Sequence, residues 1–180
     1  MMITMTAGIA AFDTELGTCA VRWTERGIAA VRLPSQRTAD LPRLDSMNGV
    51  PVPVPVREAI GAITRLLAGE SVDLGFVVLD DEEIDPFCRE VYAATRAVPP
   101  GSTATYGQIA RAIGRVDPEG ARDVGAALAR NPTPIVVPCH RVVGANGKLT
   151  GFSAPGGLET KRRMLALEGA PGYGQQVLFG

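Results

Sequence analysis

The chain has 180 residues, of which 46% are hydrophobic, and a formal net charge of −1. This length suffices for one domain or two small ones with a real core. No apolar run approaches the roughly 18 residues of a membrane span, and the first residues lack the basic segment of a signal peptide. Cys19, Cys88 and Cys139 are odd in number and widely spaced, which argues against a disulfide framework. We therefore expect a soluble, monomeric, cytoplasmic protein without a membrane partner.

The first half of the chain has the pattern of a small β-rich unit. Short apolar runs at 7–12, 18–24 and 27–33 are separated by turn residues, which predicts an antiparallel meander ended by Pro34. Residues 34–55 are rich in proline and predict an extended connector. A helix is expected from Val56 to about Ala68 and a further strand from Leu74 to Leu79.

The acidic stretch at residues 80–85 predicts a boundary between two domains, 1–84 and 85–180. Charge divides along the same line. Residues 1–85 carry 7 Arg and 13 Asp plus Glu, giving −6, whereas residues 86–180 carry 11 Lys plus Arg and 6 Asp plus Glu, giving +5. A basic second half is compatible with phosphate binding, although such a surplus is often only solvated surface.

The second half predicts three helices with sharp boundaries. The first covers 87–98 and ends at a Pro-Pro-Gly turn. The second begins at Thr105, which forms a capping-box pattern with Gln108, and ends at Gly114. The third covers 120–130 and ends before Pro132. Two short helices joined by a tight turn indicate a helix-turn-helix.

The third helix has an unusually small-residue surface. Gly125 costs about 1 kcal/mol relative to alanine inside a helix, so it is not there for helix stability. One interpretation is tight packing against another helix. The other is a smooth helix that enters a DNA groove, with Arg122 as its one long cationic side chain.

Cys139 stands next to His140, the only histidine of the chain. A thiol becomes a good nucleophile when it loses its proton, which a neutral imidazole can accept near neutral pH. The alternative is a half-buried Cys on a strand with the His in solvent. In a regular strand the two side chains would point to opposite faces, so a functional pair requires a turn in the backbone or a bridging water. Without any Cys-x-x-Cys pair, we expect no metal site.

The segment Asn131-Pro132-Thr133-Pro134-Ile135-Val136-Val137-Pro138-Cys139-His140-Arg141-Val142-Val143 resembles the methylated-DNA-protein-cysteine methyltransferases. Thr105-Tyr106-Gly107-Gln108 upstream and Leu165-Ala166-Leu167-Glu168-Gly169 downstream extend the match over residues 86–169. The resemblance implies an α+β fold, with a small ribonuclease H-like β-rich N-terminal domain and a mostly helical, winged-helix-like C-terminal domain. It also implies suicide DNA repair without a cofactor. The alkyl group on O6 of a guanine rotated out of duplex DNA would move irreversibly to the protein's cysteine.

The same resemblance implies a role for each matching residue. Cys139 would be the acceptor, His140 its base through a water, and Glu168 the carboxylate that orients the histidine. Asn131 would brace the cysteine segment, Tyr106 would assist departure of the guanine, and Arg122 would fill the gap in the base stack. The remaining expected contacts to the base or the DNA are Ser153, Phe152, Ala121, Gly125, Ala126 and Arg141.

Several positions depart from the family pattern. Asp123 places a carboxylate on the DNA-facing helix, which would weaken binding unless it turns away or pairs with an arginine. Phe152 replaces a tyrosine before Ser153, and Ala154-Pro155 interrupts the run that follows. Cys88 near a helix start is a second candidate thiol, because a helix dipole can lower a thiol pKa.

Two other functions remain open. A cysteine hydrolase would also use Cys and His, but its base usually comes from a distant segment, and this chain has no second histidine. An alkyltransferase-like protein that binds damaged DNA without repairing it would have the fold but lack the acceptor cysteine, which is present here as Cys139.

Overall fold

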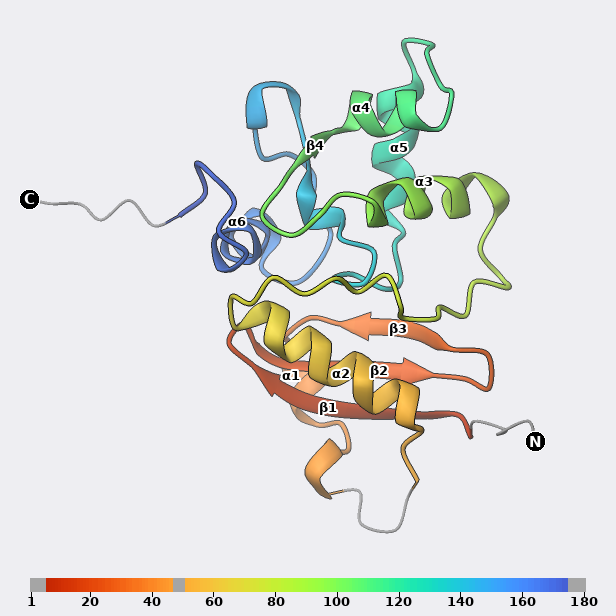
Figure 1. Cartoon of the computed structure of the whole chain (residues 1–180), viewed down its shortest axis with the longest axis vertical. Coiled ribbons are helices and arrows are strands. Elements are labelled where there is room, and N and C mark those ends of the chain that lie inside the picture. The colour runs from red at the N-terminus through yellow and green to blue at the C-terminus, as the bar shows by residue number, and fades with distance from the viewer. Residues whose placement is uncertain (1–5, 47–50, 175–180) are drawn as a thin grey trace, which may run out of the picture.

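A computed structural model describes residues 6–46 and 51–174. The chain forms a mixed α/β structure in two stacked parts (Figure 1). The lower part in this view holds a three-stranded sheet and helix α2, and the upper part holds helices α3 to α6. Within the described ranges, no helix is long and apolar enough to cross a membrane.

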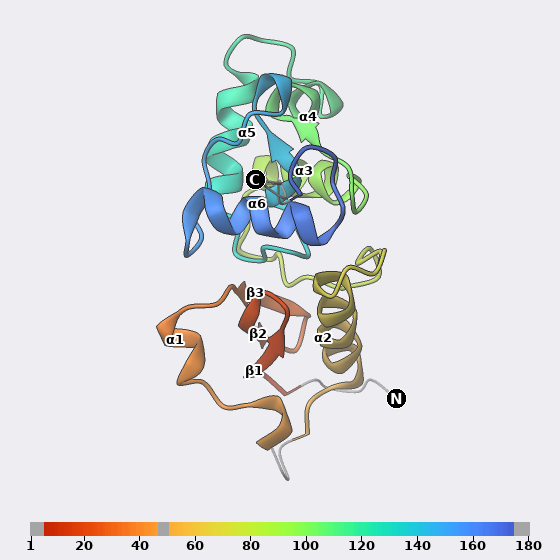
Figure 2. The same cartoon turned by 90° about the vertical axis from the view of Figure 1, so that its left-hand side faces the viewer.

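The sheet confirms the predicted meander. Strands β1 (Gly8–Thr14), β2 (Gly17–Trp23) and β3 (Ile28–Arg32) pair antiparallel in the order β1-β2-β3. Alternation places Cys19, Val21 and Trp23 on the buried face. This face packs against α2 (Val54–Leu67), which buries one stripe of apolar side chains, as predicted for this helix. Figure 2 shows the sheet and α2 side by side.

The predicted extended connector is wrong for part of its length. Residues Gln36–Ala39 form the short helix α1, and Leu44–Ser46 form a 3₁₀ turn. Ser35 and Thr38 form a local capping box, with Ser35 N donating to Thr38 Oγ1 at 2.9 Å. Between these two turns, Ala11 N donates to Pro42 O, so the segment also follows the edge of β1. Residues 47–50 of the predicted connector lie outside the described residues.

The predicted strand from Leu74 to Leu79 is also wrong. The guanidinium of Arg96 binds carbonyl groups of this segment. It donates to the carbonyl oxygens of Leu74 at 3.0 Å and of Val77 at 2.8 Å. A carbonyl turned toward a guanidinium is not available to a sheet ladder. Only Leu79 retains a strand-like contact, an isolated bridge to Ile28.

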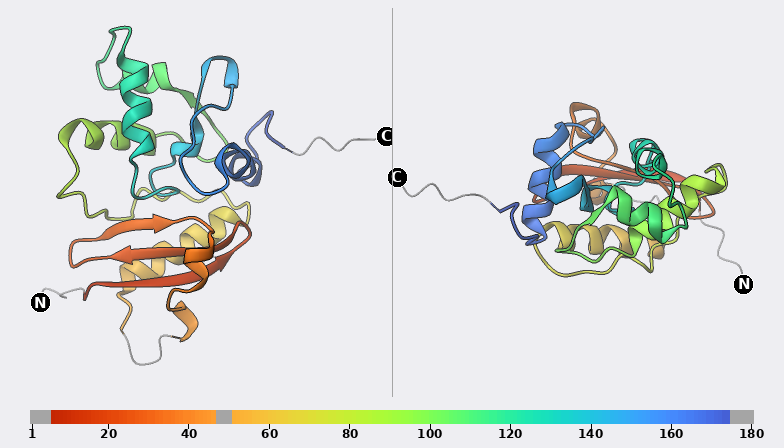
Figure 3. Two further views of the ribbon diagram at one scale, coloured as in Figure 1. Left: turned by 180° about the vertical axis from the view of Figure 1, so that it is seen from behind. Right: turned by 90° about the horizontal axis from the view of Figure 1, so that it is seen from above.

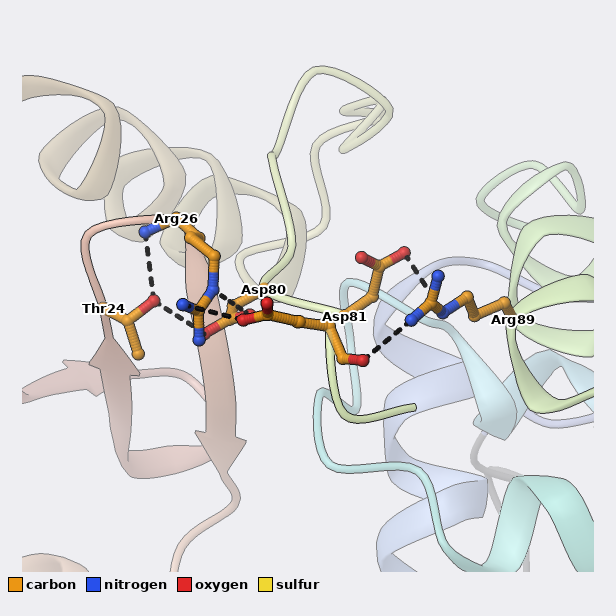
Figure 4. Close-up of polar contacts among 6 residues, drawn as sticks. Thr24, Arg26, Asp80, Asp81 and Arg89 are labelled. Carbon is orange, nitrogen blue, oxygen red and sulfur yellow. Dashed lines mark hydrogen bonds and ion pairs between the residues drawn. The ribbon is translucent and has the colours of Figure 1, made fainter. Parts of the chain in front are cut away.

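The acidic stretch between the two parts is held from both sides (Figure 4). Asp80 accepts from Thr24 Oγ1 at 2.7 Å and from Arg26 Nε at 3.0 Å, which links it to the turn between β2 and β3. Asp81 Oδ2 lies 4.0 Å from Nε of Arg89, which belongs to helix α3. The stretch therefore connects the sheet to the helical part through charge pairs at its surface, each worth about 0–1 kcal/mol.

The upper part contains the predicted helices. They are α3 (Pro86–Arg96), α4 (Tyr106–Ala112) and α5 (Gly120–Ala129), and α4 and α5 pack together as a helix-turn-helix. The Thr105–Gln108 capping box is present with both of its bonds. A two-stranded parallel pair, β4 (Ala104–Thr105) with β5 (Val142–Val143), and the helix α6 (Gly157–Leu167) complete this part.

Two large clusters of buried apolar residues correspond approximately to the two parts of the molecule. The first joins the sheet to α2 and the second joins α3, α4 and α5. However, Ile135, Val136 and Met164 from the second half of the sequence belong to the first cluster. The loop before Cys139 and the helix α6 are therefore packed directly on the N-terminal part, where α6 contacts α2 and Val31 N of β3 donates to Pro132 O.

Candidate active site

A cavity of about 840 Å³ lies between the two parts of the molecule and contains Cys139 in its wall. Helix α5 contributes Ala121, Arg122 and Gly125. Tyr106 begins α4, and the remaining wall comes from three segments, 128–134, 150–155 and 31–37. The volume lies within the roughly 300–1,000 Å³ of small-molecule sites, and such a site is large enough for a purine base.

The backbone at Cys139 turns instead of continuing as a strand. Cys139–Arg141 form one 3₁₀ turn, in which Arg141 N donates to Pro138 O at 2.9 Å. This turn removes the strand geometry that would have separated Cys139 from His140 onto opposite faces. Cys139 is half-buried at the cavity wall, whereas the His140 side chain is completely buried.

Asn131 braces the loop that leads to the cysteine. Its Nδ2 donates to Val137 O at 2.9 Å, while its Oδ1 accepts from Thr133 N at 3.0 Å. Between these contacts Ile135 has a positive φ of 75°, which a β-branched residue rarely adopts. Such a conformation costs about 1–3 kcal/mol and persists only where the surroundings hold it. The Asn131 amide and the burial of Ile135 supply that support.

His140 is held by the carboxylate of Glu168, which directly follows helix α6. Its Nε2 lies 2.8 Å from Glu168 Oε1, and both side chains are completely buried. Arg141 donates from Nε to Glu168 Oε2 at 2.9 Å and from its terminal nitrogen to Oε1 at 2.8 Å. The sequence predicted Glu168 as the group that orients the histidine, and the structure brings these two residues together.

The charges of this cluster fix which nitrogen of His140 carries a proton. Burial opposes the charge on Glu168, but the bonds from His140 and Arg141 outweigh it and lower its pKa to about 2. Burial lowers the pKa of His140, which favours its neutral form. Because Glu168 is an acceptor only, Nε2 holds the proton and Nδ1 carries a lone pair. His140 Nδ1 is also the one buried polar side-chain atom in the described ranges without a hydrogen-bond partner.

The thiol itself requires such a base. Burial raises the pKa of Cys139 above its usual value, while the Asn131 side chain and the charge of Lys161 act in the opposite direction. The protonated thiol is therefore the resting form at neutral pH.

Lys161 is a functional candidate that sequence reasoning missed. It lies on α6 and is completely buried, with Nζ donating to Val142 O at 2.6 Å, Thr150 O at 3.1 Å and Tyr106 Oη at 3.4 Å. Burial lowers its pKa to about 8. A lysine in an α-helix normally indicates an exposed face, so only its position three residues before the buried Met164 could have signalled burial.

Tyr106 lines the cavity at the start of α4, as the sequence led us to expect for a residue near the substrate. Its hydroxyl donates to Thr150 O at 3.0 Å and accepts from Lys161. Burial raises the pKa of Tyr106, so the phenol retains its proton at neutral pH.

Helix α5 presents the small-residue surface that its sequence indicated. Arg122 is exposed at the cavity and has no hydrogen-bond or ion-pair partner in the part of the chain that the structure describes. A Cβ added at Gly125 would lie 3.8 Å from the Tyr106 ring, an ordinary contact distance, so helix packing does not require this glycine. Ala121 lines the cavity, and Ala126 is exposed on the same helix without lining it.

The carboxylate of Asp123 does pair with an arginine. Arg115 donates to Asp123 Oδ2 at 2.6 Å and to Asp117 Oδ2 at 2.9 Å. Asp117 belongs to the loop between α4 and α5. Because one guanidinium serves two carboxylates, this double contact offsets part of the negative charge that would otherwise oppose DNA phosphates.

Ser153 and Phe152 both line the cavity, whereas Arg141 does not. Ser153 Oγ donates to Ala129 O at 3.0 Å, and the Phe152 ring lies 5.9 Å from Lys161 Nζ. The expectation of a DNA contact through the Arg141 side chain is wrong. That side chain is 6% exposed, and Glu168 and Val98 O occupy its guanidinium.

Cys88 does not have the features of a second reactive thiol. It is buried near the start of α3, where Arg130 donates to its sulfur at 3.3 Å. Burial nevertheless raises its pKa, so the effect of the helix dipole that the sequence suggested is outweighed.

The arrangement places a thiol in the wall of a cavity that a helix of the helix-turn-helix also lines, and the next residue in the chain is a buried histidine held by a carboxylate. Comparisons with known proteins agree with it. Residues 86–170 match the DNA-binding domain of 6-O-methylguanine DNA methyltransferase. The methylated-DNA–protein-cysteine methyltransferase of Methanosarcina acetivorans is 46% identical over 114 residues, 63% of this chain and 69% of that protein. Its namesake from Mycobacterium tuberculosis is 41% identical over 129 residues, 72% of this chain and 74% of that protein.

Solved structures extend the likeness to almost the whole chain. The crystal structure of the Mycobacterium tuberculosis O6-methylguanine methyltransferase has a TM-score of 0.67 at 32% identity, covering 91% of this chain and 93% of that one. A structure of Mycobacterium tuberculosis OGT in complex with DNA has a TM-score of 0.67 at 31% identity, covering 92% and 96%. The chain belongs to the methylated-DNA–protein-cysteine methyltransferase family.

Proposed function

We propose that this protein repairs DNA by direct reversal, moving an alkyl group from O6 of a guanine in duplex DNA to Cys139 in a single, irreversible turnover. The observation that carries the proposal is the position of the Cys139 thiol. It stands in the wall of a cavity shared with α5 of the helix-turn-helix, with the buried His140–Glu168 pair next to it in the chain. The proposed substrate is double-stranded DNA that contains O6-alkylguanine, without a cofactor.

The first step is loss of the thiol proton. A water between Cys139 and His140 would accept the thiol proton while passing its own proton to Nδ1, the nitrogen that carries the free lone pair. Glu168 then stabilises the imidazolium through its bond to Nε2, by the same orienting logic that operates in catalytic triads. Arg141 fixes that carboxylate from the other side.

The second step is displacement at the alkyl carbon. The thiolate sulfur forms a bond to this carbon, the bond between the carbon and O6 breaks, and its electron pair remains with the guanine. Tyr106 would donate a proton to a ring nitrogen of the departing guanine, and the raised pKa keeps the phenol protonated until then. The Lys161 ammonium next to Tyr106 Oη would stabilise the phenolate that results.

The guanine has to leave the base stack before either step. Extrusion of a base costs a few kcal/mol, and a side chain that fills the vacancy offsets part of it. Arg122 is exposed on α5 at the cavity and is proposed for this role. The small surfaces of Ala121, Gly125 and Ala126 would allow α5 to approach the groove, while Ser153 and Phe152 would contact the extruded base.

We further propose domains at 1–84 and 85–180, the first ribonuclease H-like and the second winged-helix-like. A meander covered by α2 supports the first assignment, and the helix-turn-helix beside the short β4–β5 pair supports the second. A monomer in the cytoplasm is proposed because one chain contributes every site residue and because the acceptor must stay reduced. A lesion-binding protein without transfer is not favoured, because the acceptor Cys139 is present.

The test is stoichiometric labelling with a duplex that contains O6-methylguanine. We expect one methyl group per protein on Cys139, found by mass spectrometry of the digested protein, and none in Cys139→Ser. Cys88→Ser is the matched control and should label like the unaltered protein. Binding of the duplex without any transfer would refute the proposed reaction.

A further inference from the structure

Two arginines of the N-terminal half line the cavity opposite α5. Arg32 ends β3 and Arg37 lies in α1, and both are exposed. Leu33 between them is buried in the core of the sheet, so this segment is anchored by packing as well as by the bond from Val31 N to Pro132 O at 3.0 Å. The pair therefore stands at a fixed place relative to the loop that leads to Cys139.

No hydrogen bond or ion pair within the described residues explains the position of these arginines. Neither Arg32 nor Arg37 has a hydrogen-bond or ion-pair partner within residues 6–46 and 51–174. By contrast, Arg26, Arg43 and Arg65 of the same half are each paired with a carboxylate. Residues 1–85 carry 13 acidic side chains, so the lack of a partner is not due to a shortage of carboxylates.

A third arginine adds positive charge at the same face. Arg22 is exposed on β2, and the register pairs Arg22 with Ala30 and Arg32 with Ala20. Arg22 and Arg32 are therefore diagonal neighbours on the face of the sheet opposite α2. Like charges at this spacing repel one another, and a bound anion would relieve the repulsion.

The position of this face matches the path of a DNA strand. Figures 2 and 3 show α1 and α5 on the same side of the molecule, with α2 on the opposite side. When the base of an extruded nucleotide lies in the cavity, its sugar and phosphates remain at the mouth. The cavity is lined by Arg122 from α5 and by Arg32 and Arg37 from the N-terminal half, and all three residues are exposed.

We propose that Arg32 and Arg37 bind backbone phosphates of the strand that carries the extruded nucleotide, so that the N-terminal half forms part of the DNA interface. This inference rests on the proposed function. A guanidinium binds a phosphate through two parallel hydrogen bonds, which an exposed arginine without a carboxylate partner is free to make. Arg22 raises the local positive potential and thereby concentrates the polyanion at this edge.

The experiment compares Arg32→Gln/Arg37→Gln with a control at Arg65 of α2, which is paired with Glu70. Duplex affinity is measured from about 50 to 300 mM salt. The slope of log K against log salt is negative, and each lost phosphate contact reduces its magnitude by about 0.9. The double variant should therefore lose about 1.8 from the slope, which corresponds to roughly 60-fold weaker binding at 0.1 M salt. Arg65→Gln should retain the original slope.

Transfer from the free base O6-benzylguanine separates this proposal from the general reaction. The double variant should react with the free base at the original rate, because no phosphate is present, and more slowly with a dilute alkylated duplex. An unchanged salt slope would overturn the phosphate role. A rate loss confined to lesions with an O6-carboxyalkyl substituent would also overturn it, because the arginines would then bind the carboxylate of the substituent and not the DNA phosphates. Failure of the unaltered protein to accept an alkyl group from any duplex would instead overturn the proposed function.

Discussion

Replacing Glu168 by Gln removes the one carboxylate that His140 and Arg141 share while conserving its shape. The pKa of Glu168 falls from the usual 4.5 to about 2. At 1.36 kcal/mol for each pKa unit, this difference corresponds to about 3 kcal/mol of stability at neutral pH. A depressed carboxyl pKa contributes stability that is fully present above the unfolded value and is lost as pH falls toward the folded value. The contribution should therefore disappear between about pH 4.5 and pH 2.

The Gln variant should lose about 3 kcal/mol at pH 7, a value near the 3–5 kcal/mol typical of a broken buried ion pair. Urea unfolding at pH 7 and at pH 3.5 measures the difference in unfolding free energy between the two proteins and its dependence on pH. The difference between the two proteins should shrink by about 1 kcal/mol at the lower pH, because the carboxyl of Glu168 is then protonated in the unfolded parent protein but still ionised in the folded one. A Gln variant within 0.5 kcal/mol of the parent at pH 7 would refute the electrostatic account of this cluster. Glu159→Gln, at an exposed position on α6, is the matched control.

The remaining predictions concern reaction and binding. Arg122→Ala should slow repair of duplex DNA much more than reaction with free O6-benzylguanine, since only extrusion needs this side chain; equal losses in the two rates would exclude that role. Asp123→Ala should change stability by less than about 1 kcal/mol, because its pair with Arg115 is partly exposed, and should tighten duplex binding in a salt titration. Alkylation of Cys139 should destabilise the protein by about 1–3 kcal/mol, because it adds volume to a packed wall; an unchanged melting temperature after complete alkylation would contradict this.

Local signals in the sequence predicted the elements whose stability is local. The meander was visible from its turn residues, and the start of α4 from the Thr105–Gln108 capping box. The segment from Leu74 to Leu79 misled the prediction because its β-rich composition is overridden by Arg96, a residue about twenty positions away whose guanidinium captures the carbonyl groups. Propensity cannot register a contact of this kind.

The site was predictable to the extent that its residues form a contiguous motif. The Cys139–His140 pair and its link to Glu168 followed from the resemblance, and the structure places the last two side chains in contact. Lys161 was missed because buried lysines are rare and because nothing next to it in the sequence indicates the carbonyl groups that accept its hydrogen bonds. Arg32 and Arg37 were missed for a similar reason, since only the packing of the sheet on the Pro132 loop brings them to the cavity.

The single use of the thiol follows from the chemistry of the product. A hydrolase with the same residues forms a thioester, whose carbonyl carbon a water activated by the histidine can attack. Transfer to Cys139 forms a thioether instead, and its saturated carbon offers no comparable site for water. In the proposed mechanism His140, oriented by Glu168, removes the first proton, but no further step of the same kind restores the thiol. The same residue types that sustain turnover in a hydrolase thus act once here, because the group transferred is alkyl and not acyl.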